Sequence, residues 1–284
     1  MQPLSITSRI VCWWMIFRTA LEERLAYRGD FALGTLMRFL PIITQIFLWW
    51  AVFESVGNGT GTDDEANTLV GYTFQNMVAY YLLSMLGRAF SSMPGLASQT
   101  AKQIREGEIK KYLVQPIDMI GFMLLARMAH KVAYYTIAIL PFALVFFLCR
   151  GYFEGWPSAE VILAFVISLV LAFLLGFLLD LCIGLIGFWF LEVSSLLFVY
   201  MLLNFFLSGH MFPLDLLPSP WATFVDYLPF RYLAYFPAAI FLGKVPEDEL
   251  WQQIGIEFVW LLVMIALARF LYARGVRRYS GFGG

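Results

Sequence analysis

Six apolar stretches of this sequence, five of them uncharged throughout and the sixth with an uncharged centre, suit membrane helices, which need about 20 apolar residues. The chain is 61% hydrophobic and only 14% charged, whereas soluble domains average roughly 25% charged residues. We therefore predict an all-α polytopic membrane protein, a single domain of about six transmembrane helices. The predicted spans are Phe39–Phe53, Ala66–Gly87, Val132–Cys149, Val161–Leu179, Val193–Gly209 and the stretch Leu250–Tyr272 around its uncharged centre Phe258–Ala268. The third span is expected to begin near Gly121, because Arg127 and Lys131 can extend their side chains toward the headgroups.

The basic residues predict the orientation of the chain. With six spans both termini share one side, and assigning that side to the cytoplasm leaves only Arg150, Arg231 and Lys244 of the 19 basic residues outside. The positive-inside rule therefore predicts cytoplasmic termini. The basic residues assigned to the cytoplasm are Arg9, Arg18, Arg24, Arg28, Arg38, Arg88, Lys102, Arg105, Lys110, Lys111, Arg127, Lys131, Arg269, Arg274, Arg277 and Arg278.

Residues 1–30 are predicted to form an amphipathic helix in the cytoplasmic membrane interface. Ile10, Trp13, Trp14, Phe17, Leu21 and Leu25 share one side of a helical projection, and Thr19, Glu22 and Glu23 oppose them. Tryptophan at headgroup depth is typical of such helices. The alternative is an N-terminal extension of the first span. The short apolar stretch is followed by charged residues rather than by a cleavage site, so no signal peptide is expected.

Residues 94–118 form a basic connection on the predicted cytoplasmic side. Pro94 suits the start of a helix, Gly107 suits its end, and Pro116 stops the next segment before the third span. On charge alone, a solvated loop attracted to anionic lipid is the simpler interpretation.

Residues 209–249 join the last two spans on the predicted outer side. This connection is rich in proline yet keeps many aromatic and aliphatic residues, so it suits neither a water-exposed loop nor one spanning helix. We predict re-entrant helices that enter the outer leaflet. Its marker residues are Gly209, Pro213, Pro218, Pro229, Pro237 and Gly243.

Several motifs, in order along the chain, resemble the permeases of type-2 ABC transporters, which are the membrane subunits of ATP-driven exporters. Residues Ile104 to Asp118 resemble the cytoplasmic loop of that family. FWFLEVSS at 188–195, LSGHMFPLDLLPSPW at 207–221 and LPFRYLAYFPAAIFLG at 228–243 are similar to one bacterial branch. With Tyr27 to Phe31 before the first span, the resemblance covers nearly the whole chain.

The resemblance implies a division of labour between subunits. Two permeases, identical or related, form the path as a dimer in the bacterial cytoplasmic (inner) membrane, and separate ATPase subunits bind beneath them. The sequence contains no G-x-x-x-x-G-K-[ST] motif, so ATP is expected on the partner subunit and no cofactor on this chain. The resemblance makes the 101–112 region the coupling element. The residues we expect there are Lys102, Arg105, Glu106, Gly107, Glu108, Lys110 and Lys111.

Two other functional classes stay open on the residues alone. An ion- or proton-coupled secondary transporter would use Asp180, Glu192 and Arg38, whereas a membrane-embedded lipid enzyme would need a convergent polar cluster, which the sequence does not show. Asp180 and Glu192 are expected to be acids at the cytoplasmic ends of spans. His130 and His210 fall on opposite predicted faces and cannot share a metal, and neither a catalytic site nor a nucleic-acid partner is expected.

A ridge of small residues is predicted on the fourth span. Ala164, Ser168, Ala172 and Gly176 recur every four residues, which favours close helix packing. Contact with another span of the same subunit is favoured over a dimer seam.

Overall fold

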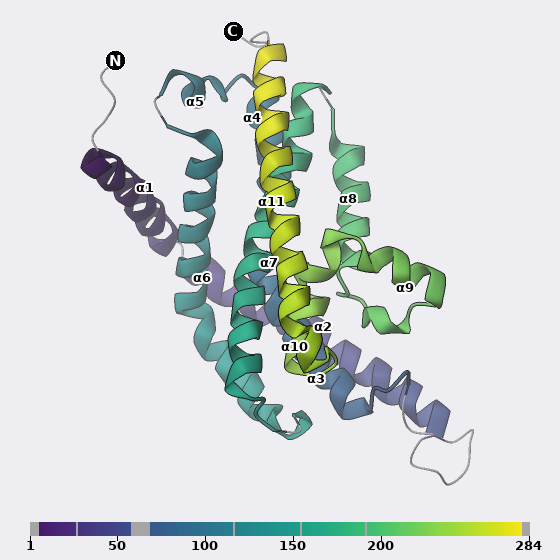
Figure 1. Ribbon diagram of the computed structural model, residues 1–284. Coiled ribbons are helices and arrows are strands. Elements are labelled where there is room, and N and C mark those ends of the chain that lie inside the picture. Colours follow the sequence, from purple (N-terminus) through teal and green to yellow (C-terminus); the bar gives the residue numbers. More distant parts are fainter. Residues whose placement is uncertain are drawn as a thin grey trace. The chain divides into compact units, whose positions relative to one another are not determined.

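The computed structural model describes residues 6–26, 28–57, 69–115, 117–153, 155–190 and 192–279 of the 284-residue chain. About 81% of the structure is helical, and the described residues contain no β-strand (Figure 1). The α-helices are α1 (Ile6–Ala26), α2 (Arg28–Gly57), α3 (Phe74–Ser91), α4 (Leu96–Arg105), α5 (Lys110–Val114), α6 (Met119–Leu148), α7 (Ala159–Leu185), α8 (Ser194–Leu207), α9 (Ser219–Asp226), α10 (Tyr235–Phe241) and α11 (Glu247–Arg278). Short 3-10 helices occur at η2 (Arg150–Tyr152), η3 (Ile186–Phe188), η4 (Leu214–Leu216) and η5 (Pro229–Leu233).

The all-α class is confirmed, and each predicted span overlaps a helix. Three of the described helical stretches, Met119–Leu148, Ala159–Phe188 and Leu250–Arg278, are long and apolar enough to cross a bilayer. Phe39–Ser55 and Ser194–Leu207 are shorter apolar helices. Together with the family described below, these helices make the chain a multi-pass membrane protein, and the count of six spans stays a prediction.

The second predicted span begins later than expected. Its helix starts at Phe74 rather than at Ala66, because Thr73 caps it by accepting a hydrogen bond from the Asn76 amide at 3.1 Å. Just before the cap, Leu69 and Tyr72 exchange backbone hydrogen bonds across a turn in which Gly71 has a φ of 76°. Glycine adopts such a φ without steric cost, and no charge marks this boundary in the sequence.

The chain divides into two compact units, one of residues 1–43 and 109–148 and the other of residues 44–108 and 149–284. In the first unit α1 packs along α6. Gly121 lies against the Trp13 ring, and a Cβ at this position would come within 3.0 Å of it. Part of the predicted apolar face of α1 therefore packs on protein, while Ile10 and Trp14 stay exposed. The position of α1 in the interface stays a prediction.

Helix α7 is the centre of the second unit, where α3, α4, α10 and α11 pack against it (Figure 1). The small-residue ridge Ala164, Ser168, Ala172 and Gly176 is buried within this unit. At Gly176 the backbone of Ser91 lies where a side chain would otherwise stand. The predicted contact within one subunit is confirmed at Gly176, which lets the backbones of α7 and α3 touch.

The 209–249 segment folds back beside α3. It enters at Gly209, whose carbonyl accepts a hydrogen bond from the Tyr80 hydroxyl at 2.5 Å, and Ala234 reaches Gly87. It then returns through α10 to Lys244, whose ammonium group donates to the Gly71 carbonyl at 2.7 Å. The stretch of α3 from Phe74 to Gly87 measures about 20 Å at a rise of 1.5 Å per residue, so the hairpin runs along most of that helix.

The marker residues of this segment shape the hairpin. Pro213 and Pro218 precede short helices, Pro229 begins one, and Pro237 lies in the first turn of α10, all positions where a missing N–H costs little. Gly209 has a φ of 79°, and a Cβ there would lie 2.6 Å from the Tyr80 hydroxyl. Gly243, with a φ of 65°, ends α10. The Gly243 N–H donates to the Ile240 carbonyl, and the Lys244 N–H donates to the Ala239 carbonyl. This pairing is the Schellman motif.

Substitution of Gly176 by alanine tests the central contact. We expect Gly176→Ala to lower the melting temperature of the purified protein, because its methyl group would collide with the Ser91 backbone, and overpacking costs about 1–3 kcal/mol. Gly255→Ala is the matched control in α11, because nothing lies within 4 Å of the added carbon, and alanine is the better helix former by about 1 kcal/mol. Equal melting temperatures for the two variants would contradict the packing described.

Candidate functional site

Helix α4 presents one buried face and one charged face. Leu96, Ala97, Thr100, Ala101 and Ile104 are buried on the same side of the helix, which packs against the end of α7 and against η3. This approach is close because both partners are small there. A Cβ at Gly184 would lie 2.7 Å from the Thr100 Cβ, and one at Gly187 would lie 3.1 Å from the Ala101 Cα. The opposite face is therefore held in a fixed orientation.

Gly107 ends this helix, as predicted. Its φ of 80° is in the left-handed region, which glycine adopts without steric cost. The Glu106 amide still bonds the Lys102 carbonyl at 2.9 Å, and the Gly107 amide bonds the Ile104 carbonyl at 3.3 Å. The chain then turns before α5 begins at Lys110.

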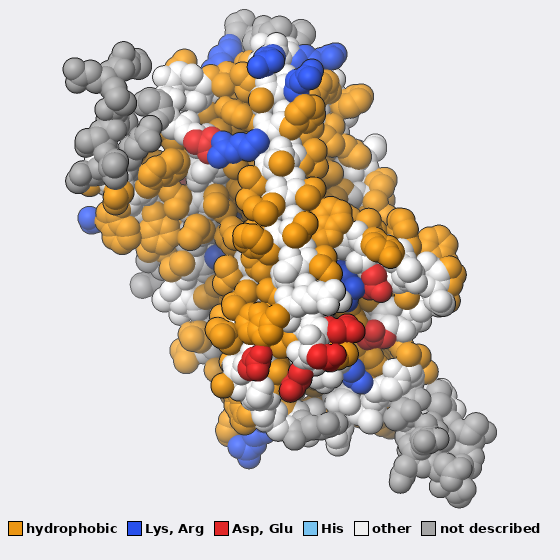
Figure 2. Space-filling model, in the orientation of Figure 1, with side chains coloured by type: hydrophobic (Ala, Val, Ile, Leu, Met, Phe, Trp, Pro, Cys, Tyr) orange, Lys and Arg blue, Asp and Glu red, His pale blue; other side chains and the backbone are white. Residues whose placement is uncertain are grey.

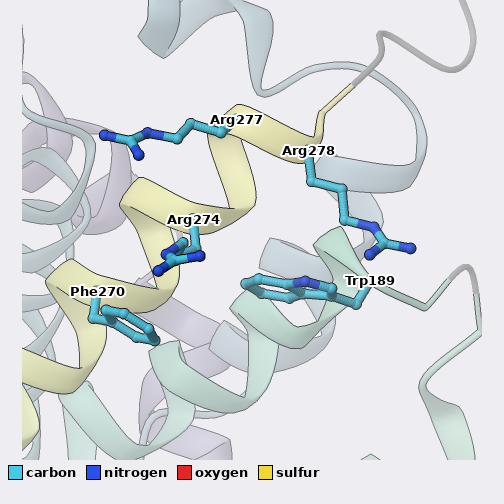
Figure 3. A pocket seen from close by; sticks show the side chains of 5 residues that line it. All are labelled: Trp189, Phe270, Arg274, Arg277 and Arg278. Atoms are coloured by element: carbon cyan, nitrogen blue, oxygen red, sulfur yellow. The ribbon is translucent and has the colours of Figure 1, made fainter.

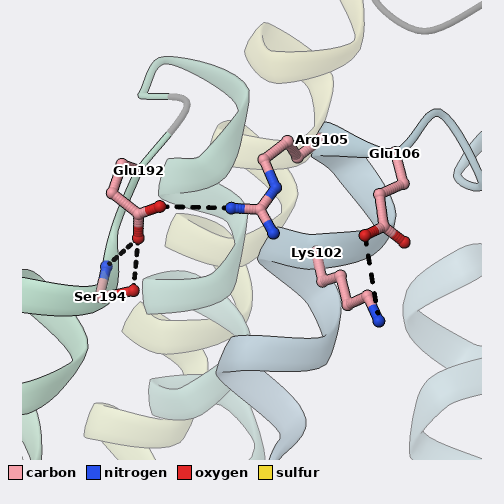
Figure 4. A network of polar contacts seen from close by, with 5 residues as sticks. All are labelled: Lys102, Arg105, Glu106, Glu192 and Ser194. Atoms are coloured by element: carbon pink, nitrogen blue, oxygen red, sulfur yellow. Dashed lines mark hydrogen bonds and ion pairs between the residues drawn. The ribbon is translucent and has the colours of Figure 1, made fainter.

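The exposed face of α4 carries two ion pairs (Figure 4). Lys102 Nζ lies 3.9 Å from Glu106 Oε1 on the same helix, and an Arg105 guanidinium nitrogen lies 3.3 Å from Glu192 Oε2. The second pair links α4 to the residues just before α8. Exposed pairs of this kind add roughly 0–1 kcal/mol to stability, so their effect is mainly to orient the charges.

Glu192 is itself held by Ser194. The carboxylate accepts hydrogen bonds from the Ser194 hydroxyl and from the Ser194 amide, the latter at 3.0 Å. These bonds, followed by the positive charge of Arg105, lower the pKa of Glu192 below its ordinary value. The carboxylate is therefore ionised at neutral pH, in reach of the Arg105 guanidinium.

The structure brings only part of the predicted coupling set together. Lys102, Arg105 and Glu106 share one exposed face of α4, and the exposed Glu108 follows in the turn. The boundary between the two compact units falls after Glu108, so Lys110 and Lys111 belong to the other unit. There Lys111 Nζ lies 5.1 Å from the centroid of the Tyr112 ring. Pro116 lies outside the described residues.

Asp180 is not the helix-end acid expected from the sequence. Helix α7 continues past it to Leu185 and then into η3, so this carboxylate lies within a helix. It accepts a hydrogen bond from the Tyr200 hydroxyl of α8 at 2.5 Å. The apolar run ended at Asp180 in the sequence, but one acid that finds a hydroxyl donor does not end a helix. The side chain of Arg38 lies outside those described.

Two features of the second unit escaped the sequence reasoning. The first is the pairing of Glu192: the sequence places this residue in the FWFLEVSS motif and at a predicted span end, but it gives no sign that Glu192 pairs with Arg105 across the fold. The second is the burial of Glu257 in α11, which lies inside the predicted sixth span Leu250–Tyr272 just before its uncharged centre. Its side chain is fully buried beside Ser168. An ionisable residue in such a place is costly.

The described residues contain no group of three or more His, Cys, Asp or Glu placed to hold a metal ion. What they do contain at α4 is a rigidly mounted helix with exposed charges of both signs, a surface suited to recognising another protein.

Comparison with known proteins fits this picture. Residues 39–283 match the family described as ABC-2 family transporter protein. None of the curated proteins matches the sequence. The family match covers most of the chain, from the first predicted span to the last and through α4, the 209–249 hairpin and Glu192. The chain therefore belongs to the ABC-2 family of transporter permeases, which are membrane components of ABC transporters.

Proposed function

We propose that this chain is the permease subunit of an ATP-driven exporter and that α4 with the turn at Gly107 docks onto a separate ATPase subunit. The family match supports the transport role. The observation that carries the docking role is the charged face of α4, which Gly184, Gly187 and the Arg105–Glu192 pair hold in place. Two permeases, identical or related, would form the path.

The proposed placement is the bacterial cytoplasmic membrane with six spans and both termini inside. In this orientation α4 faces the cytoplasm, where an ATPase resides, and the 209–249 hairpin enters the outer leaflet. The asymmetry of the basic residues supports it, because all but three of the 19 fall on the same side.

A secondary transporter and a lipid enzyme are less well supported. Glu192 is exposed and paired with Arg105, and Asp180 is bonded to Tyr200, so neither forms a chain of acids across the bilayer. Glu257 is buried within a span, but an isolated carboxyl is no relay. The family match favours ABC transport over both alternatives.

The orientation is tested by cysteine labelling in a variant whose native Cys12, Cys149 and Cys182 are replaced. Trp156→Cys should react with an impermeant maleimide in intact cells, because this position is exposed and predicted to face outward. Ser98→Cys on α4 should react only after permeabilisation. Labelling of Ser98→Cys from outside would invert the topology.

The division of labour predicts that the purified chain neither binds nor hydrolyses ATP, since the sequence contains no phosphate-binding loop. The check is nucleotide binding by calorimetry together with phosphate release, before and after adding the ATPase subunit. Turnover by a preparation shown free of other ATPases would refute the proposal.

Charge reversal tests the docking role directly. We expect Glu106→Lys combined with Glu108→Lys to leave membrane insertion intact, since added cytoplasmic positive charge agrees with the inside rule, but to release the ATPase or to uncouple hydrolysis from export. Like charges placed against a complementary patch cost several kcal/mol. Gly107→Pro should act similarly, because proline cannot adopt the φ of 80°.

Glu247→Lys combined with Glu249→Lys is the matched control. It makes the same change in net charge at exposed residues in the first turn of α11, on the predicted outer side, so its insertion is first verified by the cysteine labelling above. Co-purification of the ATPase and export should both survive it. Normal ATPase binding and export by the Glu106 and Glu108 variant would leave α4 as a solvated, lipid-facing loop.

A further inference from the structure

A hollow of about 510 Å³ opens at the C-terminal end of α11. Its walls are Trp189, which follows η3, and Phe270, Arg274, Arg277 and Arg278 of α11. Figure 3 shows the Arg274 and Arg278 side chains on either side of the Trp189 ring, with Phe270 one turn further along the helix. The Arg274 guanidinium lies 5.4 Å from the centroid of the Phe270 ring.

The charge of this hollow is unbalanced. Arg274, Arg277 and Arg278 are exposed, and none of them makes an ion pair with an acidic side chain in the described ranges. Basic residues in a last helical turn are favourable for the helix, which accounts for their presence there. It does not account for Trp189, which another element supplies. Guanidinium groups around an aromatic wall suit an anion with several oxygens, such as a phosphate.

An apolar stripe leads along α11 to this hollow. Val259, Val263 and Phe270 are 57%, 48% and 56% exposed, and with the exposed Ala266 they recur at the spacing of one helix face. The next position on that face is Arg274. In Figure 2 hydrophobic side chains cover much of α11, and Lys and Arg gather over its C-terminal end. The surface is thus an apolar stripe that ends in a positively charged patch. This arrangement is complementary to an amphiphile with an anionic headgroup.

A second copy of this chain suits the same surface poorly. A two-fold axis normal to the membrane brings identical patches together at the same depth. The arginines at the end of α11 would then face the same arginines of the partner, and like charges in contact are unfavourable. A lipid has no such conflict.

We propose that this hollow binds the phosphate headgroup of an anionic phospholipid, with an acyl chain along Val259, Val263 and Phe270. Arg274 and Arg278 hold the phosphate oxygens, and Trp189 sets the headgroup depth, as tryptophan does at membrane interfaces. The lipid belongs to the cytoplasmic leaflet in the orientation proposed above. This proposal depends on α11 crossing the bilayer and not on α4 or any ATPase. Lipid binding and ATPase docking can therefore fail separately.

The experiment compares lipid retention by the full-length protein. The purified chain is reconstituted in nanodiscs of phosphatidylcholine and phosphatidylglycerol, extracted again in mild detergent, and its retained lipids are quantified by mass spectrometry. We expect enrichment of phosphatidylglycerol. Arg274→Gln combined with Arg278→Gln should weaken that retention about tenfold or more, because each basic residue contributes roughly 1 kcal/mol to anionic lipid binding.

Three further variants make the result specific. Arg18→Gln combined with Arg127→Gln removes the same charge from the same predicted leaflet and should retain the lipid as the parent does. Arg274→Lys combined with Arg278→Lys keeps the charge but loses the paired donors of arginine, so retention should be intermediate. Trp189→Leu should weaken retention without changing net charge. Melting temperatures show whether each variant is folded.

Other outcomes would overturn the proposal. The hollow would take no anionic lipid if the parent protein retained the two lipids equally. The same would follow if the parent and the double glutamine variant retained equal amounts of phosphatidylglycerol. Displacement of the lipid by inorganic phosphate alone would assign the hollow to free anions. If the double glutamine variant retained its lipid but lost co-purification of the ATPase, the hollow would be assigned to a protein partner.

Discussion

The fold of the second unit depends on how closely backbones approach α7. At Gly176 the Ser91 backbone occupies the space of a side chain, and further along Gly184 and Gly187 receive α4 in the same way. Lipid tails are as apolar as leucine side chains, so burial of apolar surface gives helices little reason to associate within a bilayer. Van der Waals packing between closely spaced helices supplies the driving force for association instead. Small residues at regular spacing are therefore what fixes α3, α4 and α7 together.

This packing also makes the candidate coupling site rigid. Helix α4 is short, and helices below about 12 residues are marginal alone in water. Its orientation comes from the two glycines of α7 and η3 beneath it and from the Arg105–Glu192 pair beside it. Any force applied to the charged face would reach α7 directly, because only the small side chains of Thr100 and Ala101 stand between the helices at Gly184 and Gly187. A rigid connection of this kind is what the proposed transfer of work from an ATPase requires.

Local chemistry explains what could be predicted from the sequence. Uncharged runs located the apolar helices, the i, i+4 spacing of small residues located the α7 ridge, and a glycine after a helical pattern located the end of α4 at Gly107. Partners distant in the chain could not be predicted in this way. Arg105 and Glu192 are 87 positions apart, and their pairing depends on how α4 lies on α7. Charge alone also misled at Asp180, where the half-buried acid bonds the Tyr200 hydroxyl and the helix continues, and it did not reveal that Glu257 is buried.

The hairpin of residues 209–249 has a consequence for where cargo could travel. Its α10 side chains Phe236, Ala238, Ala239 and Ile240 are at most 1% exposed, and they fill the space between α3 and α7. Within the described residues of the second unit, side chains therefore fill the space between these three helices. A molecule crossing the bilayer would therefore have to move along an outer wall of this bundle. The path between two permeases proposed above would have such a wall on each side.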